Sequence, residues 1–263
     1  MDLAQERARF VTPSDFDLPP GGLNIRWPDP PLPQDERLQE WKGYAARAFA
    51  RANRVDRVTF DSPRARFGIV ASGKAYEDVD QALRALGLGP EDLARGGVRI
   101  YKVRMPWPLE PEGIRHFSEG LDEVLVVEER REIIEHQIKQ QLFNWRADVR
   151  PRIVGKFDHE DRPFLSLSKG LTVGTVARAI ADRLEANGLP SDLRERIEGR
   201  LARLEAIERE AASHEAPVLR QPWYCAGCPH NASTKVPEGS RAMAGIGCHY
   251  MVQWMDRNTE TFT

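Results

Sequence analysis

The sequence predicts an α/β fold in which helices cover both faces of a doubly wound parallel sheet. Short apolar runs recur through the middle of the 263-residue chain, and stretches with helical spacing separate them. This alternation of strand and helix implies a parallel sheet with helices on both faces. The apolar runs lie at 67–71, 98–103, 123–127 and 152–155, and the amphipathic stretches lie at 76–86, 111–119 and 132–145.

The segment before this core, residues 11–35, is rich in proline and shows neither helical nor strand periodicity. We expect it to run extended over a surface, with Ile25 and Trp27 pinning it in place. A helix is predicted from about Asp35 to Ala52. Its apolar residues recur at helical spacing, as Leu38, Trp41, Ala45 and Phe49.

Turn residues and an acidic pair mark the ends of the core elements. The turn at 72–74, Ser-Gly-Lys, joins a strand to a helix, a position where anions often bind. It lacks a full glycine-rich phosphate motif, which argues against a nucleotide site. Gly87 and Pro90 stop the following helix. We expect Glu128 and Glu129, at the end of the third strand, to cap the next helix through its dipole.

Residues 173–212 are predicted to be helical, with a break at Gly188-Leu189-Pro190. The second half alternates acidic and basic residues around one apolar seam, which is typical of a largely solvated connector. The seam comprises Leu193, Ile197, Leu201, Leu204 and Ile207.

Composition excludes several classes of protein. The formal net charge is -2, so no basic field over the whole chain attracts nucleic acid. No apolar run approaches the roughly 20 residues of a membrane span, and residues 1–10 lack the apolar core of a signal peptide. An odd number of cysteines with a Cys-x-x-Cys pair favours a reducing cytoplasm over a disulfide framework.

All three cysteines lie near the C-terminus, in the segments Cys225-Ala-Gly-Cys-Pro-His230 and Gly245-Ile-Gly-Cys-His249. A Cys-x-x-Cys places two thiolates on one tight turn, where both can reach a soft metal. Four interpretations stay open: ordinary reduced cysteines, a zinc site completed by His230 or His249, a redox-active pair, and an iron–sulfur site. A tetrahedral site needs four ligands, so the fourth is a histidine, another subunit or further sequence.

These segments, with Val236-Pro-Glu-Gly-Ser-Arg241 between them, resemble the start of the thiamine-diphosphate domain of indolepyruvate ferredoxin oxidoreductases. The likeness to the wider 2-oxoacid:ferredoxin oxidoreductases is looser. Further resemblance lies upstream. The motifs at 61–74, 106–109 and 126–129 are similar to the transketolase-C-terminal-like domain of the family, and 19–28 is similar to the segment that links it to a pyrimidine-binding domain. By this resemblance, the turn at 72–74 would mainly support assembly.

The resemblance implies a division of the chain and a chemistry. The division would be a linker and connecting helix at 1–57, the transketolase-C-terminal-like domain at 58–190, a helical connector at 191–220 and a truncated thiamine domain from 221 to 263. The family oxidises 2-oxoacids with thiamine diphosphate, Mg²⁺ and a [4Fe-4S] cluster. Its partners would be ferredoxin, coenzyme A and the 2-oxoacid, in a homo-oligomer without nucleic acid or membrane.

By the same resemblance, three thiolates would bind the cluster, at Cys225, Cys228 and Cys248. Gly245, Ile246, Gly247 and Cys248 would form a turn against the thiamine cofactor. His230 and His249 would lie near the thiazolium or substrate as proton donors. For each histidine, a surface or supporting role is an equally good interpretation.

The family pattern continues beyond this sequence on both sides, so we expect an internal piece of a longer enzyme that is inactive by itself. The predicted activity is oxidative decarboxylation of indolepyruvate or another aryl-pyruvate to the acyl-CoA, with ferredoxin as acceptor. Two alternatives stay open. One is a zinc-stabilised α/β assembly module without catalysis, and the other is a 2-oxoacid oxidoreductase with another substrate.

Overall fold

The computed structural model describes residues 10–214 and 220–260. The chain divides into two compact units, Met1–Glu208 and Arg209–Thr263, which are described separately. The first unit holds the five-stranded sheet, with the strands β1 (Arg57–Phe60), β2 (Phe67–Ser72), β3 (Val98–Val103), β4 (Glu123–Val127) and β5 (Arg152–Val154). Its helices are α1 (Pro31–Arg37), a π-helical turn η1 (Leu38–Lys42), α2 (Gly43–Ala52), α3 (Gly73–Ala85), α4 (Pro90–Arg95), α5 (Pro111–Ser118), α6 (Ile134–Leu142), α7 (Val173–Ala186) and most of α8 (Ser191–Ser213).

The sheet has the strand order β1-β3-β2-β4-β5. Strands β2 to β5 are parallel, and β1 pairs with β3 in the antiparallel direction at one edge. Strands β2 and β4 are buried along their whole lengths except at Ser72, the last residue of β2. Burial on both faces explains why they read as continuous apolar runs instead of alternating ones.

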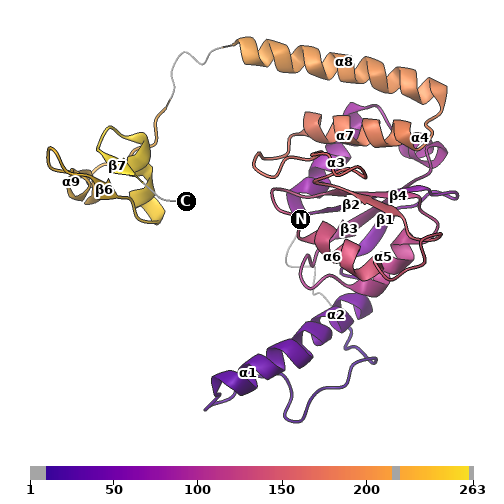
Figure 1. Cartoon of the computed structure of the whole chain (residues 1–263), viewed down its shortest axis with the longest axis horizontal. Helices are drawn as coiled ribbons and strands as arrows, with labels where there is room; N and C mark the ends of the chain where they lie inside the picture. Colours follow the sequence, from indigo (N-terminus) through magenta and orange to yellow (C-terminus); the bar gives the residue numbers. More distant parts are fainter. Residues whose placement is uncertain (1–9, 215–219, 261–263) are drawn as a thin grey trace. The chain divides into compact units, whose positions relative to one another are not determined.

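Helices cover the sheet in two layers (Figure 1). On one face, α3, α7 and α8 bury their apolar sides against side chains such as Ile69 and Val127. On the other face, α5 and α6 pack against Val70, Val124 and Val126. The doubly wound α/β prediction is therefore confirmed, and so are its four parallel strands.

Two elements of the sheet unit were not predicted. Strand β1 escapes a search for apolar runs because three of its four residues are exposed, as an edge strand permits. Helix α4 begins at Pro90, which the sequence analysis used only as the stop of the preceding helix. Proline is also favoured in the first turn of a helix, and the carboxylate of Asp92 accepts the backbone N–H of Gly89 there at 3.1 Å.

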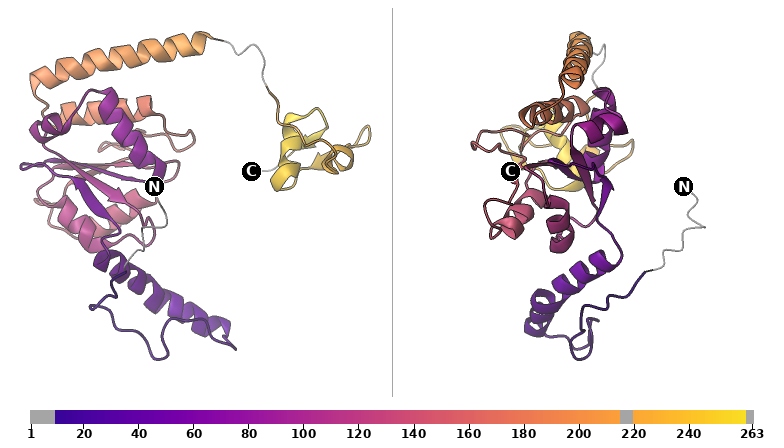
Figure 2. Two further views of the ribbon diagram at one scale, coloured as in Figure 1. Left: turned by 180° about the vertical axis from the view of Figure 1, so that it is seen from behind. Right: turned by 90° about the vertical axis from the view of Figure 1, so that its right-hand side faces the viewer.

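A helical rod made of α1, η1 and α2 extends from the sheet, and an extended segment folds back beside it (Figure 2). The rod begins at Pro31, four residues before the predicted start, because Pro31 and Pro33 both fit the first helical turn. The expected anchors of the extended segment are wrong, since Ile25 and Trp27 are 85% and 97% exposed. Aromatic contacts hold it instead, from Phe10 to Phe49 and from Phe16 to Trp41.

Helices α7 and α8 meet at the predicted break, where Gly188 has a φ of +88°. Leu193 and Ile197 of α8 are buried in the core, and Leu201 and Leu204 pack against it partly buried, as expected for an apolar seam on a largely solvated helix. The seam ends there, because Ile207, which was expected to belong to it, is 53% exposed. None of the described helices is long and apolar enough to cross a bilayer.

Candidate functional site

The C-terminal unit is built from short elements around a small core. They are α9 (His230–Ser233), β6 (Ala242–Met243), a 3₁₀ helix η2 (Gly247–Trp254) and β7 (Thr259–Glu260). Strands β6 and β7 pair in parallel. The core of the described part comprises the buried side chains of Tyr224, Val252 and Met255.

The Cys-x-x-Cys segment is a tight turn closed by the backbone. The N–H of Cys228 donates to the carbonyl of Cys225 at 3.1 Å, and Gly227 between them has a φ of +77°. The side-chain amide of Asn231 donates to the same carbonyl at 3.0 Å. This geometry presents both sulfurs from one turn, with Cys225 exposed and Cys228 half-buried.

The two candidate histidines lie next to each other. Their rings are 5.8 Å apart in an edge-to-face arrangement, and the Tyr224 ring stacks on His230 at 5.2 Å. The Nδ1 atom of His230 lies 3.2 Å from the sulfur of Cys228. Folding therefore brings residues from both halves of the cysteine-rich region, 225–230 and 245–249, into one group.

The second half of the region turns around His249. Its Nδ1 accepts the N–H of Gly245 at 2.7 Å, so in the neutral ring Nε2 carries the proton and is free to donate it. Gly247 has a φ of +82°, a conformation that glycine adopts without strain. Ile246 is fully exposed at the tip of the turn. The turn thus presents backbone and a proton-bearing imidazole together.

The thiols do not form a complete metal site in this conformation. Among residues 10–214 and 220–260, no three histidine, cysteine or acidic side chains come close enough to hold an ion. The donor chemistry nevertheless suits a soft metal, because three thiols occupy one small unit. The two segments that carry them meet in the fold, since the hydroxyl of Tyr224, next to Cys225, donates to the carbonyl of His249, next to Cys248, at 3.3 Å.

Arg257, near the end of this unit, contacts residues near its beginning, and sequence reasoning missed this role. Its guanidinium lies over the rings of Trp223 and Tyr224, at 5.5 and 5.9 Å from their centroids. It also donates to the hydroxyl of Thr234 at 2.7 Å. No local pattern marks an arginine that acts across more than 20 residues, so only the folded structure reveals this role.

The carboxyl ends of β2 and β4 lie where the strand order reverses, the usual ligand-binding position in such sheets. Here the position is occupied by internal contacts. The ammonium of Lys74 donates to Asp78, Glu129 and the carbonyl of Leu171 at 2.6 to 3.1 Å, which uses its three protons. Contacts within the sheet unit therefore hold the turn at 72–74, and its role in assembly stays a prediction.

The two acidic residues after β4, Glu128 and Glu129, have different partners. Glu128 accepts the backbone N–H groups of Ile133, Ile134 and Glu135 at 2.9 to 3.0 Å and so caps α6, as predicted. Glu129 instead pairs with Lys74, which lowers the pKa of its carboxyl. Beside them the buried ammonium of Lys156 donates to the carbonyl of Glu128, and burial lowers the pKa of that lysine.

Known proteins resemble this chain along much of its length. The family model of the indolepyruvate ferredoxin oxidoreductase middle domain matches residues 56–214, more than half of the chain. The indolepyruvate oxidoreductase subunit IorA of Thermococcus kodakarensis is 31% identical over 190 residues, covering 70% of this chain and 25% of the relative. That of Methanothermobacter marburgensis is 26% identical over 183 residues, covering 70% and 24%.

Solved structures give weaker matches. An inactive tetramer of a split-gene transketolase has a TM-score of 0.34 at 18% identity, covering 49% of this chain and 41% of that one. A 2-oxoglutarate:ferredoxin oxidoreductase from Magnetococcus marinus has 0.32 at 14%, covering 59% and 24%. The chain spans about a quarter of the length of the curated relatives it matches. On the family match, the chain belongs to the indolepyruvate ferredoxin oxidoreductase family, whose middle domain occupies residues 56–214.

Proposed function

We propose that this chain is part of a thiamine-diphosphate-dependent enzyme that oxidatively decarboxylates indolepyruvate or another aryl-pyruvate. The product would be the acyl-CoA, and ferredoxin would accept the electrons in the cytoplasm. The observation that carries the proposal is the family match over 56–214, followed in the same chain by the cysteine-rich unit. Homo-oligomeric assembly and the division of the chain at 57, 190 and 220 belong to the same proposal.

The C-terminal unit would hold the cofactors. Thiamine diphosphate with Mg²⁺ supplies the carbon nucleophile for decarboxylation when bound, and an iron–sulfur cluster carries single electrons. The thiols of Cys225, Cys228 and Cys248 would bind the cluster, with a fourth ligand from outside this chain. The exposed turn from Gly245 to Cys248 would approach the thiamine cofactor with its backbone.

The two histidines would have different roles: His249 would donate a proton, and His230 would hold a cluster ligand in place. His249, with its Nδ1 occupied by the N–H of Gly245, would donate from Nε2 to an oxygen of the substrate. His230 would hold the sulfur of Cys228 through the 3.2 Å contact of its Nδ1. The stacked ring of Tyr224 fixes the plane of His230, so the orientation of this contact is set before any cofactor arrives.

The test of the function is turnover in the enzyme purified without oxygen from its own cells by a tag on this chain. We expect reduction of a viologen dye that requires coenzyme A and thiamine diphosphate and is faster with indolepyruvate than with pyruvate or 2-oxoglutarate. Faster reduction with either of the other acids would replace the substrate but keep the enzyme class. No reduction with any of the three acids would contradict the proposal.

The test of the cluster is metal content. After anaerobic incubation with iron and sulfide, we expect a brown protein containing iron, and Cys225→Ser, Cys228→Ser and Cys248→Ser should each lower the iron content. Hydrogen exchange of the sheet unit should stay unchanged in all three variants and serves as the folding control. Full iron content in every variant would show that these thiols are not ligands.

The zinc-stabilised assembly module is the second candidate, because the Cys228–His230 contact offers the mixed sulfur and nitrogen ligands that zinc accepts. It predicts a colourless protein with stoichiometric zinc and no dye reduction. Metal analysis of the purified protein therefore separates the two candidates.

A further inference from the structure

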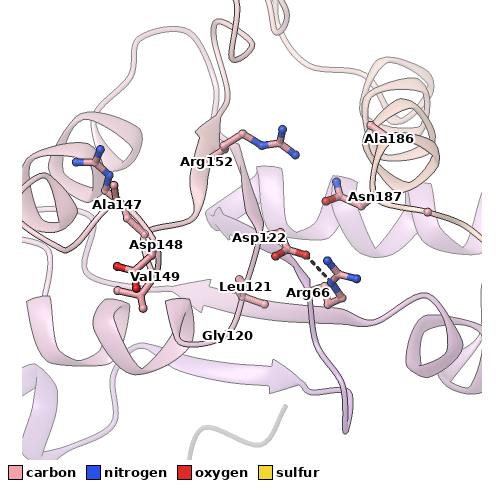
Figure 3. A pocket seen from close by; sticks show the side chains of 12 residues that line it. Arg66, Gly120, Leu121, Asp122, Ala147, Asp148, Val149, Arg152, Ala186 and Asn187 are labelled. Carbon is pink, nitrogen blue, oxygen red and sulfur yellow. Dashed lines mark hydrogen bonds and ion pairs between the residues drawn. The ribbon is translucent and has the colours of Figure 1, made fainter.

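Arginines in the two units of the chain differ in their partners. In the sheet unit, a hollow at the amino ends of β2, β4 and β5 is lined by Arg66 and Arg152, and each of them faces a carboxylate. Figure 3 shows the ion pair of Arg66 with Asp122. In the C-terminal unit, the guanidinium of Arg257 contacts carbonyl, hydroxyl and aromatic groups, and no carboxylate among the described residues pairs with it. Its contacts therefore fix the geometry of neighbouring groups.

The backbone around Arg257 is itself held in place. Its N–H donates to the carbonyl of the buried Met255 at 2.9 Å, and its carbonyl accepts the hydroxyl of Thr259 at 3.2 Å. The carbonyl of Asn258, just before β7, accepts the N–H of Ala242 in β6 at 3.2 Å. The side chain of Arg257 therefore extends from a point that the small core and the strand pair fix together.

One nitrogen of this guanidinium reaches α9, the helix that follows the Cys-x-x-Cys turn. Nη1 donates to the carbonyl of Asn231 at 3.1 Å and to the hydroxyl of Thr234 at 2.7 Å. Thr234 is buried, and its hydroxyl donates in turn to the carbonyl of His230 at 2.6 Å. Arg257 thus binds α9 directly and also through Thr234.

Residues of α9 hold the two cysteines of the turn. The backbone N–H of Asn231 donates to the carbonyl of Cys228 at 3.0 Å, and its side-chain amide donates to the carbonyl of Cys225 at 3.0 Å. Nδ1 of His230 lies 3.2 Å from the sulfur of Cys228. The contacts of Arg257 with α9 are therefore passed on to the backbone of both cysteines and to one of their sulfurs.

The planar face of the guanidinium provides a second connection. It lies over the rings of Trp223 and Tyr224, at 5.5 and 5.9 Å from their centroids, where a cation is attracted to an aromatic ring. Tyr224 directly precedes Cys225, and its ring stacks on that of His230 at 5.2 Å. The start of the turn and the imidazole beside it are therefore held by stacking as well as by hydrogen bonds.

We propose that Arg257 is a positioning residue for the metal site of this unit. By holding α9 and the ring of Tyr224, it keeps the thiols of Cys225 and Cys228 where one metal ion binds both. Groups that orient metal ligands without touching the metal raise its affinity, because the ligands lose less freedom on binding. The inference rests on the proposed role of these cysteines as metal ligands.

The experiment is titration of Co²⁺ into the whole reduced chain in the absence of oxygen, because the charge-transfer absorption of cobalt reports how many thiolates bind it. We expect Arg257→Gln to weaken Co²⁺ binding by about 10- to 100-fold. It should also lower the thiolate absorption at saturating Co²⁺, since a thiol that is no longer held in place does not reach the metal. Arg257→Lys keeps the charge and a donor but loses the planar face, so it should weaken binding by a smaller factor.

Thr234 provides a matched pair of variants. Thr234→Val keeps the shape of the side chain but removes the hydroxyl between Arg257 and His230, and it should weaken Co²⁺ binding. Thr234→Ser keeps that hydroxyl and should bind Co²⁺ as the unchanged chain does. Arg220→Gln is the control for charge, since Arg220 is an exposed arginine of the same unit, and it should leave binding unchanged.

The spectrum at saturating Co²⁺ separates positioning from general stabilisation of the unit. If Arg257→Gln reaches the spectrum of the unchanged chain at saturation, or binds Co²⁺ as tightly as Arg220→Gln does, the inference is overturned and the proposed cluster is unaffected. If the unchanged chain shows no thiolate absorption with Co²⁺, the cysteines do not form a metal site, and the inference and the proposed cluster are both contradicted.

Discussion

The two units of this chain are stabilised in different ways. In the sheet unit, 26 buried apolar residues lie on one face of the sheet and 12 on the other. In the described part of the C-terminal unit, the corresponding core has three residues, and its strands are two residues long. A core of that size does not stabilise a fold without disulfides, metals or a partner. The sheet unit is therefore specified by its apolar pattern, and we expect the C-terminal unit to depend on a metal or a partner for its stability.

The largest expected effect is on the sheet unit. Phe117 is almost fully buried, and its ring lies 5.1 Å from that of Tyr101 and fills the space above Gly68. Phe117→Ala should lower the free energy of unfolding by about 3–5 kcal/mol, measured by urea denaturation. Phe143→Ala, which removes a ring that is 71% exposed, is the control and should cost under about 0.5 kcal/mol. Similar losses in both variants would show that the core is not what holds this unit.

The next effect is confined to the C-terminal unit. If a metal binds the folded unit at 100 times its dissociation constant, it stabilises that unit by about 2.7 kcal/mol. Adding a chelator should then speed hydrogen exchange around Tyr224 and Val252 by about 100-fold and leave β2 and β4 unchanged. If hydrogen exchange at Tyr224 and Val252 is equally slow with and without metal, the three-residue core is sufficient to stabilise the C-terminal unit. The two units would then not differ in the way proposed here.

Buried strands and local caps could be predicted from the sequence, whereas contacts between distant segments could not. Strands β2 and β4 were recognisable because burial on both faces requires apolar residues at successive positions. The cap at Glu128 was recognisable because it acts on residues only five to seven positions away. Interactions across long separations left no local signal. The role of Arg257 and the contact of Lys74 with Leu171 depend on how distant segments meet.

A smaller effect tests a polar contact within the sheet unit. Glu128 is buried and accepts three backbone N–H groups at the start of α6. Glu128→Ala leaves those donors without their charged acceptor and should cost about 2 kcal/mol by urea denaturation. The control is Glu129→Ala, which removes a partly exposed partner of Lys74 and should cost under about 1 kcal/mol. A larger loss of stability in Glu129→Ala than in Glu128→Ala would contradict the roles assigned to the two carboxylates.

The smallest effect concerns Asp56, whose Oδ1 accepts the N–H groups of Arg104 and Met105 at 2.6 and 3.0 Å. Burial raises the pKa of this carboxyl, and the nearby charge of Glu110 adds to the rise. The folded state therefore binds more protons than the unfolded state above pH 3.8, and stability falls as the pH rises from there through the folded pKa. Asp56→Asn keeps the acceptor, stays neutral and presents an amide nitrogen in place of Oδ2.

We expect Asp56→Asn to match the unchanged chain near pH 3.5 and to exceed its stability by about 1 kcal/mol at pH 7, because Oδ2 of Asp56 is buried without a partner among the described residues. Urea denaturation at several pH values measures the difference. A constant difference across this range would show that the carboxyl does not titrate with folding. If Asp56→Asn is less stable than the unchanged chain at pH 7, the two hydrogen bonds that the ionised carboxyl accepts stabilise the fold by more than the burial of its charge costs. A polar contact, and not apolar packing, would then decide stability at this point of the sheet unit.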